Sequence, residues 1–141
     1  MNETDNRNEG IEMLNELLQT ADWKTEKHVP AIDAPDMAKS GEVFEVNVSL
    51  GREVAHPNTT AHHIGWIALY FKPEGGKFPY EVGRVELSAH GASTDGPDES
   101  GVYTHHGCTF HMKTSHPGEL MAMAHCNIHG LWQSSKKLSL N

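Results

Sequence analysis

The sequence has few cysteines, no long apolar run and a shortage of basic residues, and each shortage excludes a class of protein. Two cysteines, Cys108 and Cys126, allow at most one disulfide bond, so a disulfide framework does not hold the fold. In a reducing compartment, free or metal-bound thiols are expected. No apolar run approaches the roughly 20 residues that a membrane helix needs, which excludes a membrane span. Eleven Lys and Arg against 19 Asp and Glu give a net charge of −8, and a chain this acidic is a poor nucleic-acid binder.

The first ten residues give an expectation for where in the cell the protein is located. They read MNETDNRNEG, which is polar and acidic and lacks the basic flank and apolar run of a secretory signal. We therefore expect a cytoplasmic protein. A length of 141 residues fits one domain with a hydrophobic core, and we expect residues 1–9 to be frayed.

Hydrophobic periodicity predicts one short helix followed by strands. Ile11, Leu14, Leu17 and Leu18 recur at helical spacing, so residues 10–20 are expected to form an amphipathic helix that packs on the domain or on a neighbouring subunit. From residue 40 onward the period becomes two. Strands are expected at residues 44–50, 64–71, 80–87, 102–113, 120–125 and 138–140, with a surface loop at 91–101.

This order of elements predicts an all-β fold, an immunoglobulin-like antiparallel β-sandwich with a short N-terminal helix. Two parts are expected. Residues 1–21 form an N-terminal extension that contains the helix, and residues 22–141 form the sandwich domain. The sequence contains no internal repeat and no linker that would divide the second part further.

Histidine is the residue in excess, and metal binding is the usual reason for such an excess. Of eleven histidines, several lie with one cysteine in three segments, EKHVP, HPNTTAHH and CNIHG. Cys126 and His129 have C-x-x-H spacing, which lets a thiolate and an imidazole from one tight turn reach the same metal, and Gly130 can relax that turn. A structural zinc site normally adds a second cysteine-rich knuckle. The chain has none, which argues against a zinc ribbon.

A second pair of candidate ligands flanks a Pro-Asn-Thr-Thr loop. His56 and His62 can turn toward one ion, and His63 directly follows His62 at the start of a strand. Successive side chains in a strand point to opposite faces, so one of His62 and His63 is expected to be a ligand and the other not. The pattern does not choose between them. One thiolate with several imidazoles suits iron, copper or zinc and does not suit magnesium or calcium.

The segments EKHVP, HPNTTAHHI and CNIHGLW resemble the signature of the superoxide reductases of the neelaredoxin type, the single-iron relatives of desulfoferrodoxin. Between them, LYFKPEGG, YEVGRVELSAHG and GPDESGVYT also resemble that family, in the expected order. The similarity runs from about Asp22 to Trp132, most of the chain. The four cysteines of the rubredoxin-like domain in the two-iron relatives are absent from this sequence.

The resemblance implies one iron ion per subunit, Fe²⁺ or Fe³⁺, in a square-pyramidal site within the 22–141 domain. The implied equatorial ligands are four imidazoles and the axial ligand is a thiolate, from His28, His56, His62, His129 and Cys126. The family pattern uses the first of the paired histidines, hence His62. It also implies an open sixth position opposite Cys126, which Glu26 can occupy in the oxidised state, and a guiding role for Lys27 in the attraction of superoxide.

The activity that the resemblance implies is one-electron reduction of superoxide to hydrogen peroxide, with the iron re-reduced by a rubredoxin-like donor. A homotetramer is implied, with a homodimer as the alternative. Two other functions stay open: a non-catalytic iron-binding or electron-transfer protein, and a superoxide dismutase that needs no external donor.

The remaining candidates are expected to be structural. Cys108 lies in a predicted strand and is expected to be a small buried hydrophobe. Trp66 and Trp132 are expected in the core. His125 stands where the family usually has an aromatic residue, most often tyrosine, and can alter hydrogen bonding near the sulfur. The other histidines are expected at the surface or in hydrogen bonds: His63, His90, His105, His106, His111 and His116.

Overall fold

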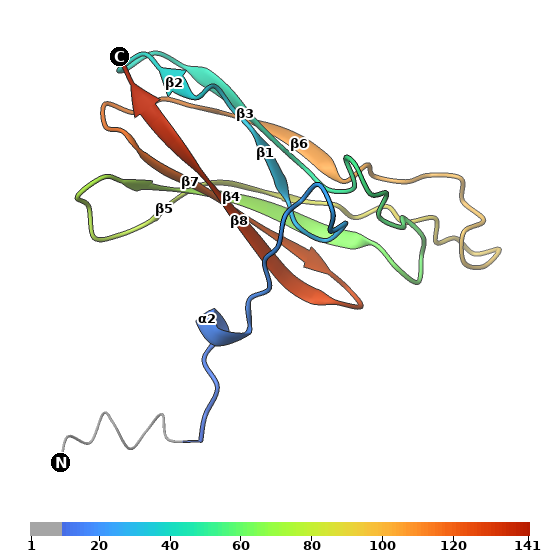
Figure 1. Ribbon diagram of the computed structural model, residues 1–141. Helices are drawn as coiled ribbons and strands as arrows, with labels where there is room; N and C mark the ends of the chain where they lie inside the picture. The colour runs from blue at the N-terminus through green and yellow to red at the C-terminus, as the bar shows by residue number, and fades with distance from the viewer. Residues whose placement is uncertain (1–9) are drawn as a thin grey trace.

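Two β-sheets pack face to face in the computed structural model, which describes residues 10–141 (Figure 1). The three-stranded sheet has the order β1-β3-β6, and the five-stranded sheet has the order β2-β8-β7-β4-β5. The pairs are antiparallel except for β2 and β8, which run parallel. The all-β sandwich expected from the sequence is therefore confirmed. The expected fraying of residues 1–9 falls outside the described residues.

The strand bounds follow the alternation of apolar and polar residues. The small sheet consists of β1 (Ala31–Asp33), β3 (Phe44–Ser49) and β6 (Gly107–Met112). The large sheet consists of β2 (Met37–Ala38), β4 (Ile64–Pro73), β5 (Tyr80–Glu86), β7 (Gly118–Cys126) and β8 (Gly130–Leu140).

The core lies between the two sheets and is made of the inward side chains of each. Val46 and Val48 of β3 are fully buried, as are Ile67 and Leu69 of β4. Along β7 the buried positions alternate with half-exposed ones, so every second side chain points inward. Removal of this apolar surface from water is the main favourable term in folding, and it makes the sandwich a stiff frame for the loops at its ends.

Two strand predictions needed correction, and two short strands were missed. The segment 102–113 forms a strand only from Gly107, because residues before it belong to the long loop that bridges back to His90. The last strand begins at Gly130, not at residue 138, because its polar stretch pairs along its whole length with β7. The strands β1 and β2 were not predicted, since three and two residues are too few to show a period.

The N-terminal helix is shorter than predicted. Among residues 10–20, only α2 (Leu14–Leu17) is helical, and none of its residues is buried. A helix this short gains little stability from its own hydrogen bonds, and its apolar side chains, Leu14 and Leu17, stay about half exposed. Further on, the backbone at Gln19 pairs with β8 through bonds to Leu131 and Gln133. No helix within residues 10–141 has the length and apolar character needed to cross a membrane.

One end of the sandwich gathers three irregular segments. Residues 22–30 precede β1, residues 50–63 join β3 to β4, and the turn at 126–130 joins β7 to β8. The β4–β7 ladder reaches this end with Ile64 opposite Cys126, and the β7–β8 hairpin closes there with Cys126 opposite Gly130. The three histidine-containing segments of the sequence are therefore brought together by strand pairing.

Candidate metal centre

Four side chains converge at this end of the sandwich. Each offers one ligand atom, and these atoms all lie within 4.8 Å of one another: His28, His62, Cys126 and His129. They come from the three irregular segments, so residues up to 101 positions apart in the chain meet at one point. The convergence agrees with four of the five ligands that the family resemblance implies.

The C-x-x-H pair lies in the β7–β8 turn. Cys126 is the last residue of β7 and its side chain is buried, with 1% exposed. Its Sγ accepts a hydrogen bond from the backbone N–H of His129 at 3.4 Å and lies 3.6 Å from Nδ1 of that imidazole. Gly130, with φ of 81°, takes the left-handed conformation that lets the turn reverse so sharply. The tight turn predicted from the spacing is present.

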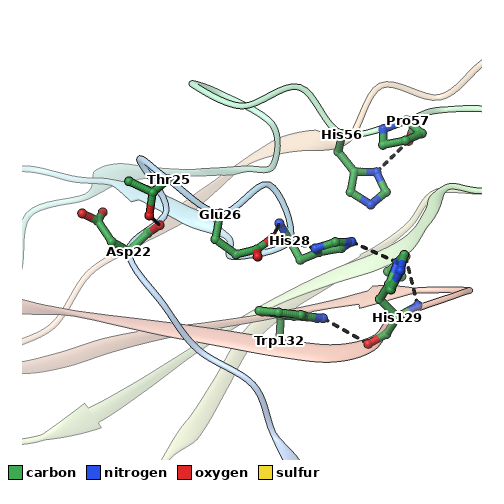
Figure 2. A network of polar contacts seen from close by, with 9 residues as sticks. Asp22, Thr25, Glu26, His28, His56, Pro57, His129 and Trp132 are labelled. Carbon is green, nitrogen blue, oxygen red and sulfur yellow. Dashed lines mark hydrogen bonds and ion pairs between the residues drawn. The ribbon is translucent and has the colours of Figure 1, made fainter.

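His28 is oriented by a carboxylate. Oε1 of Glu26 lies 2.6 Å from Nδ1 of His28 and accepts the backbone N–H of the same residue at 3.0 Å (Figure 2). A carboxylate at this ring nitrogen favours the tautomer with hydrogen on Nδ1. The other ring nitrogen, Nε2, lies 3.1 Å from Nδ1 of His129 and so faces the converging group.

Trp132 supports the same two histidines. Its indole stacks on the ring of His28 with centroids 4.9 Å apart and planes 21° apart. Its Nε1–H donates to the carbonyl oxygen of His129 at 3.1 Å, as Figure 2 shows. The expectation that Trp132 is a core residue is therefore wrong: the side chain is half-buried and lies against the site.

His56 borders the group and completes the set of candidate ligands. Its ring lies edge-on to His28 and His62, at centroid distances of 5.0 and 4.9 Å. Nδ1 of His56 lies 2.6 Å from the carbonyl oxygen of Pro57, which can only accept, so this nitrogen carries the hydrogen. That leaves Nε2 with a free lone pair. Nε2 of His56 and Nε2 of His62 are both buried and have no hydrogen-bond partner.

Burial keeps these two imidazoles neutral. It lowers the pKa of His56 to about 4, and it also lowers the pKa of His62, with help from the neighbouring His129 and His28. Neutral imidazole is the form that binds a metal ion. A buried nitrogen without a partner costs about 1–3 kcal/mol, a cost that a bound cation would remove. Four imidazole nitrogens and one thiolate therefore fit a transition metal such as iron.

The paired histidines point to different sides, although both lie in the loop before β4 and not in the strand. His62 turns into the group, whereas His63 turns away from it. Nδ1 of His63 lies 2.9 Å from the carbonyl oxygen of Thr59, and its ring stacks flat on His90 at 3.5 Å. This placement agrees with the choice of the first histidine that the family resemblance implies.

The two charged candidates sit beside the ligands. Lys27 is half-buried, and its positive charge contributes to the lowered pKa of His62, which places that charge near the group. The backbone N–H of His28 is the largest cause of the lowered pKa of Glu26, so this carboxylate is ionised at neutral pH. In the described conformation Glu26 holds His28, and a role as sixth ligand stays a prediction.

The other singled-out residues lie away from the ligand atoms, and the expectations for Trp66 and His106 were wrong. Trp66 is half-buried on the outer face of the large sheet, opposite His125, and does not belong to the core. Cys108 is half-buried against the core, and burial raises the pKa of its thiol to about 11, so it behaves as the expected hydrophobe. His125 points outward and stacks on Trp66 at 6.0 Å. His106 is not at the surface: it is buried, its Nδ1 has no partner, and its ring lies 5.8 Å from His56. No spacing in the sequence marks it.

The chain is similar to known proteins over most of its length. The desulfoferrodoxin family matches residues 20–135. The neelaredoxin of Megalodesulfovibrio gigas is 59% identical over 125 residues, which are 89% of this chain and 96% of that protein. The superoxide reductase of Pyrococcus furiosus is 50% identical over 126 residues, which are 89% of this chain and 99% of that protein. The solved structure of the reduced superoxide reductase (neelaredoxin) of Archaeoglobus fulgidus has a TM-score of 0.82 at 58% identity and covers 88% of this chain and 99% of that one. The chain therefore belongs to the desulfoferrodoxin family.

Proposed function

We propose that the protein is a superoxide reductase, which reduces superoxide to hydrogen peroxide with one electron and two protons. The observation that carries the proposal is the convergence of a buried thiol and three imidazoles, with the ring of His56 beside them. Nε2 of His56 and Nε2 of His62 are buried without a hydrogen-bond partner. Relatives named neelaredoxin or superoxide reductase, from 44% to 59% identical over nearly their whole length, support it.

The proposed ligands are His28, His56, His62, His129 and Cys126, holding one iron ion per chain. When bound, iron would supply the single electron by passing from Fe²⁺ to Fe³⁺, and a thiolate ligand would push electron density toward it. Five protein donors are one fewer than a filled octahedral shell contains. This favours a reaction with a small molecule over pure electron transfer.

The chain's own residues prepare the site for that chemistry. Glu26 and the carbonyl of Pro57 each hold the Nδ1 side of a histidine, which leaves Nε2 of His28 and His56 free to bind. The backbone N–H of His129 donates to Sγ of Cys126, which holds the sulfur in place within the turn. The indole of Trp132 covers one face of His28 and excludes water from it.

Lys27 is proposed to attract the anionic substrate. The chain has a net charge of −8, so its overall field repels superoxide. A local positive charge beside the site reverses the field at short range and raises the rate of encounter. The positive charge of Lys27 is one of the causes that lower the pKa of His62, so Lys27 lies near that imidazole, which supports this role.

The remaining proposals concern the electron donor, the compartment, the domain boundary and the oligomeric state. We propose a rubredoxin-like protein as the donor that re-reduces the iron, a cytoplasmic location in which the protein removes superoxide, and an iron-binding domain at residues 22–141.

We also propose a homotetramer, with a homodimer as the alternative. The outward face of the large sheet supports self-association, because four large half-buried side chains lie on it: Trp66, Tyr70, Met121 and Met123.

The reaction is tested by mixing anaerobically reduced protein with superoxide in a stopped-flow instrument. Oxidation of the iron in one fast bimolecular step is expected, with one hydrogen peroxide formed per iron and no oxygen released. Oxygen evolved in equal amount to peroxide, with no donor consumed, would instead establish a dismutase. Iron that stays reduced on mixing would leave an electron-transfer protein as the answer.

The metal and its thiolate ligand are tested by elemental analysis and visible absorption. We expect one iron per chain and, in the oxidised protein, a sulfur-to-iron charge-transfer band. Cys126→Ser should lose this band, because serine offers no sulfur. Cys108→Ser is the matched control and should keep it, since Cys108 lies outside the group. A band that survives in Cys126→Ser would contradict the assignment of the thiolate ligand.

Lys27→Ala should slow the bimolecular step by roughly tenfold at low salt and weaken its dependence on ionic strength. Lys137→Ala is the control, since it removes the same charge from β8, about 23 Å beyond Gly130 at about 3.3 Å per residue. The control should leave the rate close to that of the wild type. Equal rates for the two variants would remove Lys27 from the mechanism.

The tetramer is tested by sedimentation equilibrium of the holoprotein. A mass near four times 15.6 kDa is expected. Met123→Glu places a charge at the centre of the outward face and should lower the mass measured by sedimentation. Its far-ultraviolet circular dichroism spectrum should stay unchanged. Val102→Glu, at an exposed apolar residue in a loop, adds the same charge as a control. A monomeric wild type would refute self-association.

A further inference from the structure

Asn127 joins two of the segments from which the candidate ligands come. It lies between Cys126 and His129 in the β7–β8 turn, and its main chain and side chain both reach across to the segment that contains His62. Its Nδ2–H donates to the carbonyl oxygen of Ala61 at 2.9 Å. Its Oδ1 accepts the backbone N–H of His63 at 2.8 Å. Its backbone N–H donates to the carbonyl oxygen of His63 at 3.2 Å.

These three bonds lie where regular strand pairing ends. The β4–β7 ladder reaches Ile64 opposite Cys126, and its register is already irregular between Ile64 and Trp66. His62 lies two residues beyond that last pair. The bonds of Asn127 attach to the residues on both sides of His62, so they carry the cross-strand connection past the ladder.

The other bonds of this loop act within it or anchor its far side. Thr59 and His62 bond to each other through the Thr59 hydroxyl and through their backbones, which fixes the local shape of the turn. Thr60 bonds to Asp98 and to the carbonyl of His90, which ties the loop to the segment after β5. Neither set determines the distance between His62 and the Cys126–His129 turn.

We propose that Asn127 is a positioning residue that sets this distance, so that the His62 imidazole and the Cys126 thiolate are correctly spaced before a metal arrives. This inference rests on the proposed function, since it assumes that the converging residues bind iron. Asn127 itself offers no ligand to the group. It acts through the two neighbours of His62.

The side chain must be an amide to make both bonds. Oδ1 needs to accept and Nδ2 needs to donate, and only asparagine provides both at this length. An aspartate would keep the acceptor for His63 but would face the carbonyl of Ala61 with a second oxygen. An alanine would lose both side-chain bonds and leave only the backbone bond to His63.

The experiment measures how fast iron leaves the protein. Anaerobically loaded Fe²⁺ protein is mixed with excess ferrous chelator, and the release rate is compared for wild type, Asn127→Ala and Asn127→Asp. Loss of an outer-shell partner typically weakens metal binding 10–100-fold, and we expect release to be faster in that range in both variants. Their charge-transfer bands should also shift or broaden, since the sulfur and His62 are no longer held at one spacing.

The control distinguishes positioning from general stability. Asn47 also makes a side-chain hydrogen bond between segments far apart in sequence, to Thr109 at 3.1 Å, but it does so between β3 and β6. Asn47→Ala should leave iron release unchanged. The thermal midpoint of the metal-free protein should fall no further in Asn127→Ala than in Asn47→Ala, so the effect is on the bound metal.

Three results would overturn the inference. Iron release from Asn127→Ala at the wild-type rate would show that the spacing is held without it. Release from Asn127→Asp at the wild-type rate would show that the bond to Ala61 contributes nothing. A metal-free protein destabilised in Asn127→Ala far beyond Asn47→Ala, with an unshifted band, would reduce Asn127 to a structural residue. A wild type that holds no iron and shows no charge-transfer band would instead refute the proposed function itself.

Discussion

The burial of two imidazole nitrogens without a protein partner is the constraint on which the site depends. Nε2 of His56 and Nε2 of His62 have been removed from water and receive no hydrogen bond in return. Each costs about 1–3 kcal/mol, a large share of the 5–15 kcal/mol by which a domain is stable. A fold tolerates this only if its frame is stiff, because loosely held loops would turn the rings back to water. The close-packed core between the sheets provides that stiffness.

The donors come from irregular segments, but strand pairing determines where those segments begin. Cys126 is the last paired residue of β7, fixed on one side by Ile64 and on the other by Gly130. The thiol therefore belongs both to the hydrophobic core and to the site. A shift of one residue in β7 would turn Cys126 to the outer face, so the register of the sheet and the chemistry of the site are set together.

How much could be predicted from the sequence depends on whether a feature is local. The alternation at Val46 and Val48 and the C-x-x-H turn are local, and both were predicted. The polar residues of β8 show no apolar period, because their order comes from pairing with β7, and most of that strand was missed. His28 lies 101 positions from His129, so only a family resemblance could place it at the site. The burial of His106 and the stacking of Trp132 on His28 are tertiary packing, which no local pattern reports.

Whether a histidine turns Nδ1 or Nε2 toward the centre depends on how far along the chain it lies from Cys126. His129 is only three residues from Cys126, so Nδ1, the ring nitrogen nearer to its own backbone, is the one that lies close to the sulfur. His28 and His56 come from separate segments and point Nε2, the ring nitrogen farther from the backbone, toward the centre. Glu26 and the Pro57 carbonyl bind their Nδ1 atoms. An imidazole free to exchange its tautomer would offer a proton to the metal for part of the time. Because Glu26 and the Pro57 carbonyl each act on the nitrogen opposite the centre, the Nε2 lone pairs of His28 and His56 point inward, and these two rings need no rearrangement of hydrogen atoms to bind a metal. His129 differs, because its Nδ1 carries the hydrogen that Nε2 of His28 accepts at 3.1 Å and must give up that hydrogen before it binds.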